Sequence, residues 1–193
     1  MFLLLSTLLV AAPAPQVVAP ADTGWTKNGV TMAETIDVEG HTLTLNGMAL
    51  RTKTFLKVKV YVGGLYLVTP SHSAEEILAA DAPRRMVMHF VTGRATKDKM
   101  CGAWNDGLKD NTPNASEQLK QEFTQLCGMM RDIKNGEDVV ITYVPGSGTS
   151  IEIGGTMMGN IAGKDFADAV LRCWIGPKPD PGEGFKKDVL GQG

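Results

Sequence analysis

Alternation of apolar and polar residues with a period of two predicts the strands of this chain. Residues 41–45 read HTLTL, and residues 57–67 carry the strongest strand pattern in the sequence. Because successive side chains of a strand point to opposite faces, the second strand is expected to have one apolar face and one basic, aromatic face. The apolar face comprises Val58, Val60 and Val62, and the other face comprises Lys57, Lys59 and Tyr61.

Helical periodicity and capping residues predict the helices, and Ser73, Thr96 and Ser116 are the expected N-caps. The order of the elements is strands, two longer helices, more strands and a helix. That order favours an α+β fold with a large, mostly antiparallel sheet and helices on one face. The helices are expected at residues 73–80, 96–110, 116 to about 135, 163–175 and 185–190, and further strands at 84–91, 138–144, 149–153 and 156–161.

Glycine pairs mark places where the backbone is expected to turn or to be approached closely. Asn46-Gly47 is typical of a turn or bulge, and Gly63-Gly64 permits a bend or a close contact. The segment 145–149, PGSGT, lacks the lysine and the following helix of a phosphate-binding loop. It is therefore interpreted as a hairpin turn.

The first residues resemble a targeting signal. Residues 2–12, FLLLSTLLVAA, are apolar but too short to cross a bilayer, and small residues with an A-x-A site at 19–21 follow. We expect residues 1–21 to be a signal peptide cleaved before Asp22, and residues 22–193 to form a single domain that is exported to the periplasm or secreted. The charged start of such signals is missing, so an ordinary hydrophobic N-terminus remains the alternative. No later stretch is long enough for a stable membrane span.

Charge and histidine spacing exclude several classes of function. The net charge of −2 offers no concentrated basic patch, so no nucleic-acid partner is expected. The histidines at 41, 72 and 89 have no partner at helical spacing, so neither a metal site nor a metal cofactor is expected.

Three cysteines leave one thiol over if two of them pair. Cys101 and Cys127 lie on the two predicted helices that a short turn near Pro113 connects. Antiparallel packing about that turn would bring them level, which predicts a Cys101–Cys127 disulfide. The alternative is that all three cysteines are small buried hydrophobic residues.

One group of residues remains as candidate chemistry: Arg51 with Lys57, Lys59 and Tyr61. An arginine presents a fixed fork of donors that matches a carboxylate or an enolate oxygen, and a tyrosine hydroxyl can complete such a site. The alternative is a solvated polar face of a sheet.

Several stretches resemble the chalcone isomerase family, in particular its bacterial chalcone-isomerase-like branch. They are residues 45–51 (LNGMALR), 59–67 (KVYVGGLYL), 138–149 (DVVITYVPGSGT) and 163–176 (GKDFADAVLRCWIG). The resemblance implies an open-faced β-sandwich, in which a large antiparallel sheet and a layer of helices enclose a cleft. It also implies chemistry without a cofactor: the family's enzymes close a chalcone to a flavanone, and its non-catalytic members bind fatty acids.

The resemblance also assigns site residues. Arg51 matches the family's catalytic arginine, which would stabilise a phenolate or hold a carboxylate. Tyr61 replaces a threonine of the isomerases, and Thr92, Lys99 and Asp165 fall where their other polar site residues are expected. Because the arginine is kept while most of the water-holding set is changed, the resemblance favours binding over catalysis.

The sequence therefore predicts an exported chalcone-isomerase-like protein that binds a small amphipathic acid, such as a fatty acid, in a cleft with an arginine clamp. Two alternatives stay open. The protein is an intramolecular lyase or isomerase that acts on a chalcone-like enone with Arg51 as its catalytic residue, or it is a structural domain without a ligand.

Overall fold

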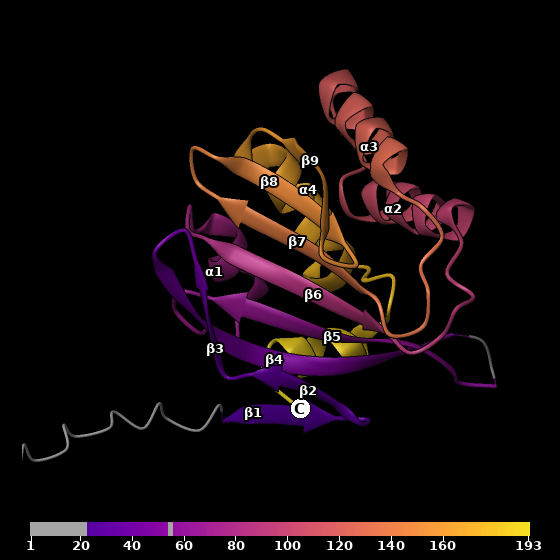
Figure 1. Cartoon of the computed structure of the whole chain (residues 1–193). Coiled ribbons are helices and arrows are strands. Elements are labelled where there is room, and N and C mark those ends of the chain that lie inside the picture. The colour runs from indigo at the N-terminus through magenta and orange to yellow at the C-terminus, as the bar shows by residue number, and fades with distance from the viewer. Residues whose placement is uncertain (1–22, 54–55) are drawn as a thin grey trace, which may run out of the picture.

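The computed structural model describes residues 23–53 and 56–193, so the predicted signal segment lies outside the described residues. Its centre is a curled antiparallel sheet of seven strands, whose spatial order follows the sequence from β3 to β9 (Figure 1). The first two strands pair separately and lie beside β4. The strands are β1 (Gly24–Lys27), β2 (Val30–Ala33), β3 (Thr35–Val38), β4 (His41–Lys53), β5 (Val58–Leu67), β6 (Arg84–Phe90), β7 (Asp138–Val144), β8 (Gly148–Ile153) and β9 (Thr156–Ile161).

In the described part of the chain, five helices connect or follow these strands, which confirms the predicted α+β class. Ser73, Thr96 and Ser116 cap the first three through their side-chain oxygens, as predicted. In Figure 1 the two C-terminal helices lie behind the sheet, and the hairpin of α2 and α3 lies beside it. The helices are α1 (Ala74–Ala79), α2 (Lys97–Asn111), α3 (Glu117–Met129), α4 (Lys164–Ile175) and α5 (Glu183–Val189).

The predicted extent of the third helix is wrong at its C-terminal end. The helix ends at Met129, and Met130 already has extended backbone angles. The cause is tertiary: Ile133 forms an isolated bridge with Ala95, in which its N–H donates to the Ala95 carbonyl at 2.9 Å. A helix that continued to residue 135 would lose this bond and would expose the buried Ile133 side chain.

The Asn46-Gly47 pair forms a bulge within one long strand, β4, where the pairing with β5 shifts register. The buried Asn46 amide joins three segments, because it donates to the carbonyls of Ser71 and Val189 and accepts from the Ser71 N–H. A Cβ on Gly47 would lie 2.2 Å from the Asp188 carbonyl oxygen. The end of α5 therefore packs directly on the bulge, and only glycine leaves room for it.

Gly63 and Gly64 allow close contacts on opposite faces of β5. A Cβ on Gly63 would lie 2.5 Å from the Phe185 ring, and one on Gly64 would lie 2.4 Å from the Met32 sulfur. The first contact belongs to the main core between the sheet and the helices. The second belongs to a smaller core, in which β2 covers the other face of the sheet. The prediction of close approach at this pair is confirmed on both faces.

The predicted apolar face of β5 is buried only in part, and the alternative of a solvated opposite face is wrong for Tyr61. Tyr61 is 2% exposed and lies in the main core, whereas Val58 is 38% exposed. Lys57 and Lys59 are exposed. The helices and the N-terminal hairpin cover the strand only from about Val60 onward. Position along the strand therefore decides burial here as much as the alternation of faces does.

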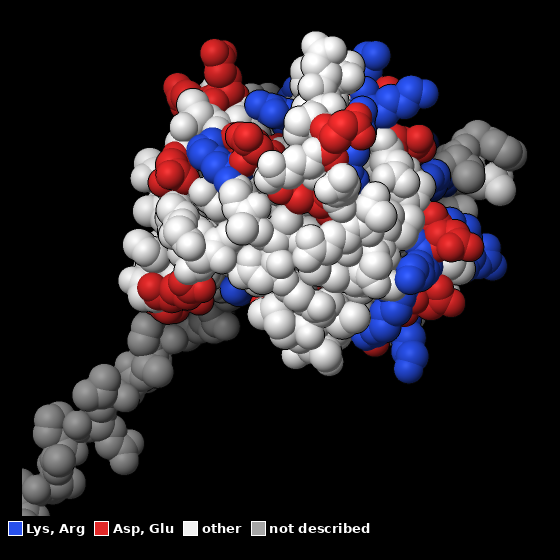
Figure 2. All heavy atoms as spheres, turned by 90° about the horizontal axis from the view of Figure 1, so that it is seen from above, with Lys and Arg blue, Asp and Glu red and all other residues white. Residues whose placement is uncertain are grey.

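None of the helices in the described part of the chain is long and apolar enough to cross a membrane. Figure 2 views the molecule from above, where acidic and basic side chains are mixed around a broad uncharged area.

Candidate functional site

Arg51 and Tyr61 lie opposite each other on the paired strands β4 and β5, at the edge of the main core. The Arg51 side chain is only 10% exposed, and its guanidinium carbon lies 5.6 Å from the centroid of the Tyr61 ring. A guanidinium over an aromatic face is attracted by the electrons of the ring. The two residues proposed as a clamp from the sequence are therefore neighbours in the fold.

Trp174 of α4 fixes the Tyr61 hydroxyl from the helix side. Its indole Nε1–H donates to the hydroxyl oxygen at 2.9 Å. Phe90 and Phe185 enclose the Tyr61 ring, with centroid distances of 5.3 and 5.8 Å. Among residues 23–53 and 56–193, no group accepts the hydroxyl proton of Tyr61. The hydroxyl is thus a buried donor whose own proton is unused.

Burial raises the pKa of the Tyr61 hydroxyl above its ordinary value of 10, and the neighbouring Arg51 charge opposes this shift only in part. The phenol therefore stays neutral at physiological pH and can donate a hydrogen bond. A neutral phenol beside a permanently charged guanidinium makes a site with two kinds of donor, which suits an anionic oxygen.

Asp180 forms an ion pair with the Nη2 atom of Arg51. It lies in the segment 177–182 that connects α4 to α5, and its side chain is 23% exposed. The Asp180 N–H donates to the carbonyl of Cys173 at 2.9 Å. This aspartate is the acidic partner that the structure gives to Arg51.

Trp104 of α2 extends the cluster. Its ring meets the Trp174 ring edge to face, with centroids 5.3 Å apart, and the residue is 3% exposed. Its Nε1–H has no hydrogen-bond partner within the described residues. The Trp104 N–H and the Tyr61 hydroxyl are thus two buried donors without an acceptor in the described residues.

Thr92 and Lys99, which the family resemblance suggested as ligand-binding residues, stay predictions, and no hydrogen bond or ion pair in the described residues links either side chain to Arg51 or Tyr61. Thr92 follows β6 and is half-buried, and Lys99 is exposed in the first turn of α2. The Lys99 amine donates to the Arg94 carbonyl at 2.9 Å.

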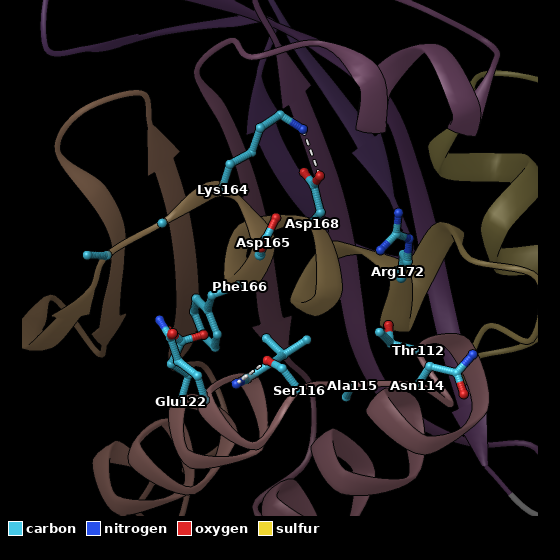
Figure 3. A pocket seen from close by; sticks show the side chains of 14 residues that line it. Thr112, Asn114, Ala115, Ser116, Glu122, Lys164, Asp165, Phe166, Asp168 and Arg172 are labelled. Carbon is cyan, nitrogen blue, oxygen red and sulfur yellow. Dashed lines mark hydrogen bonds and ion pairs between the residues drawn. The ribbon is translucent and has the colours of Figure 1, made fainter.

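Asp165 lies in a different hollow, of about 550 Å³, between the starts of α3 and α4 (Figure 3). The charged side chains of Lys164, Asp168 and Arg172 also line it, and Lys164 pairs with Asp168 at 2.7 Å. A helix rises about 1.5 Å per residue, which places Asp165 about 14 Å from Trp174 along α4. This charged hollow is therefore separate from the arginine cluster.

All three cysteines are free thiols in the structure, in contrast to the predicted disulfide. The start of α2 nevertheless lies against the end of α3, and the Cys101 thiol donates to the Cys127 carbonyl at 3.6 Å. The disulfide therefore stays a prediction for the oxidised protein. No group of three histidine, cysteine or acidic side chains that could hold a metal ion occurs in the described residues.

Sequence reasoning missed the roles of Asp180 and Trp174. Trp174 belongs to a predicted apolar stripe, and the hydrogen-bonding role of its indole leaves no trace in periodicity. Asp180 is the single acid among the prolines of residues 177–181 (PKPDP). The position of this single acid among prolines was the one signal in the sequence that Asp180 has a special role. Its partner Arg51 is remote in the sequence, and only the fold identifies it.

Comparison with known proteins complements this geometry. A family model described as chalcone isomerase-like matches residues 25–191. No curated protein sequence matches the chain. Among solved structures, the chain is similar to a fatty-acid binding protein of Arabidopsis thaliana, with a TM-score of 0.66 and 20% sequence identity. The match covers 87% of this chain and 96% of that one, and at this identity it shows the fold alone.

Proposed function

Since the chain belongs to the chalcone isomerase-like family, we propose that it binds an amphipathic carboxylic acid, such as a fatty acid, with the carboxylate on Arg51 and Tyr61. The observation that carries the proposal is the unused hydroxyl proton of Tyr61 beside the guanidinium of Arg51. A buried donor without an acceptor is unfavourable, and a carboxylate would satisfy it. The fatty-acid binding by the Arabidopsis protein of the same fold supports this choice of ligand.

The chemistry of the two donors favours a carboxylate over a neutral head group. A guanidinium and a carboxylate form charge-assisted hydrogen bonds, which are roughly twice as strong as neutral ones. The low exposure of both side chains limits screening by salt. The Trp174 N–H occupies one lone pair of the Tyr61 oxygen, so the hydroxyl can still donate its own proton to an incoming acceptor.

The apolar part of the ligand would lie against the main core. Phe90, Phe185 and Met88 are buried next to Tyr61 or beside it on the sheet. Five surface hollows of the described residues, of about 20 to 620 Å³, do not include Arg51 or Tyr61 in their walls. An acyl chain would therefore have to displace side chains, and flexible methionines such as Met88 suit such repacking.

The experiment is native mass spectrometry of the purified protein, together with extraction and identification of bound lipid. We expect co-purified fatty acid in the wild type and its loss in Arg51→Ala. Arg85→Ala is the matched control, because Arg85 is a half-buried arginine of the same sheet that donates to Thr142 instead. If Arg51→Ala retains as much fatty acid as the wild type, the proposed clamp is wrong.

The isomerase alternative is tested separately. Incubation of delipidated protein with a chalcone panel, followed at the enone absorbance band, should show no loss above background under the binding proposal. Loss that depends on Arg51 would instead favour the enzyme.

A further inference from the structure

We propose that Asp180 is a built-in competitor for the ligand: its carboxylate occupies Arg51 in the ligand-free protein, and the strap at residues 177–182 must shift before a ligand carboxylate can bind. The inference rests on the proposed function and adds its regulation. The structure described above is then the closed state of the site. This explains why Arg51 and Tyr61 border none of the five hollows.

Competition at Arg51 follows from the chemistry of its contact with Asp180. Asp180 offers Arg51 the same functional group that a fatty acid would offer, and it does so on Nη2. Two carboxylates on one guanidinium repel each other, so the bound ligand and the paired Asp180 exclude each other at neutral pH. In the closed state Arg51 has its counter-charge, whereas the hydroxyl proton of Tyr61 still lacks an acceptor.

The strap at residues 177–182 can open because it is weakly attached to the rest of the fold. No residue between 177 and 182 is buried, and three of the six are prolines, which have no N–H to donate. Asn111 holds the strap through two bonds to the backbone of Lys178, of 2.8 and 2.9 Å. The Asp180 N–H forms one further bond, to the Cys173 carbonyl. Few bonds and no buried side chain make this a segment that can open without disturbing the core.

The surroundings of the strap offer a route for an acyl chain. A groove of about 620 Å³ begins at Gly176 and Pro177 and continues between α1 and the end of α4. The apolar side chains of Leu78 and Ile175 line it. Displacement of the strap would join this groove to the edge of the main core where Arg51 lies.

The central test compares binding of dodecanoate and dodecanol by wild-type, Asp180→Asn and Asp106→Asn proteins, after delipidation, by isothermal titration calorimetry. Asp106→Asn is the matched control, since it removes an exposed aspartate of α2. We expect Asp180→Asn to bind dodecanoate about tenfold more tightly than the wild type. This gain is predicted if the strap is open, and the site able to bind, in about one wild-type molecule in ten. Dodecanol should gain less, because the opened strap helps both ligands whereas only dodecanoate is also relieved of repulsion by the Asp180 carboxylate.

Hydrogen exchange on the wild-type protein provides a readout that needs no variant. Dodecanoate should speed exchange of the Lys178 and Asp180 amides, whose bonds to Asn111 and Cys173 hold the strap. Unchanged exchange on binding, equal gains for dodecanol, or no gain for Asp180→Asn would each overturn the inference while leaving the proposed function intact. Dodecanoate binding that persists in Arg51→Ala would overturn the proposed function itself.

Discussion

The hydrogen bond from Trp174 to Tyr61 can be measured against an internal control, because the cluster contains two tryptophans in different states. Trp174 is 2% exposed and its indole N–H is bonded, whereas Trp104 is 3% exposed and its N–H has no partner among the described residues. Replacing each with phenylalanine removes a similar part of a buried ring. Only Trp174→Phe also removes a hydrogen bond.

The expected free energies follow from these two differences. Loss of ring volume costs each variant about 1–2 kcal/mol through the cavity that remains. Trp174→Phe loses a further 1–1.5 kcal/mol or so with the bond, whereas Trp104→Phe regains about 1–3 kcal/mol because a buried, unsatisfied donor disappears. We therefore expect Trp174→Phe to be less stable than Trp104→Phe by about 2–4 kcal/mol.

Urea unfolding of delipidated protein, followed by far-ultraviolet circular dichroism, measures this difference. With an m-value of about 2 kcal/mol/M, the two midpoints should differ by about 1–2 M. In a Tyr61→Phe background the excess cost of Trp174→Phe should vanish, since the acceptor is gone. Equal destabilisation of the two tryptophan variants, within about 0.5 kcal/mol, would refute the assignment of a stabilising bond to Trp174.

Three other predictions concern stability and processing. Glu137 is paired with Arg131 at 2.8 Å, and that bond lowers the pKa of Glu137 from 4.5 to about 2. The stability advantage of the wild type over Glu137→Gln should therefore hold above pH 4.5 and disappear as the pH falls through 2. Melting temperatures of the two proteins that differ by the same amount at every pH would contradict this expectation. A Cys101–Cys127 disulfide should stabilise the protein by about 3.5 kcal/mol through loop closure, seen as a melting temperature that falls with reductant. Burial and the neighbouring Cys101 thiol raise the pKa of Cys127 to about 12, so oxidation at neutral pH should be slow, and three free thiols after prolonged oxidation would exclude the bridge. Intact mass of exported protein should give Asp22 as its first residue, whereas retention of residue 1 would favour the ordinary hydrophobic N-terminus.

The elements with strong local signals could be predicted from the sequence alone. The caps at Ser73, Thr96 and Ser116 work through a side chain and backbone within the same turn, so their information is local. The glycines at 63 and 64 likewise indicate a close contact with neighbouring side chains, because any other residue would place a Cβ in the space those side chains occupy. The alternation in β6 places Met86, Met88 and Phe90 in the core, as a strand packed on helices requires.

Local signals failed where a partner distant in sequence decides the outcome. The bridge between Ile133 and Ala95 ends α3 early, although the helical pattern runs on. The helix layer buries Tyr61 on the face that also carries the lysines, while Val58 of the apolar face stays exposed, so burial does not follow the alternation of faces alone.

The features of the candidate site also fall into those that local sequence predicts and those that distant contacts decide. The sequence by itself determined the family, the sheet and the neighbouring positions of Arg51 and Tyr61, because strand pairing follows from short-range pattern and motif. Only the tertiary structure decided that Trp174 bonds to Tyr61 and that Asp180 neutralises Arg51. Those contacts join residues that are remote along the chain. Their energy depends on burial and geometry, which exist only once the helices pack on the sheet.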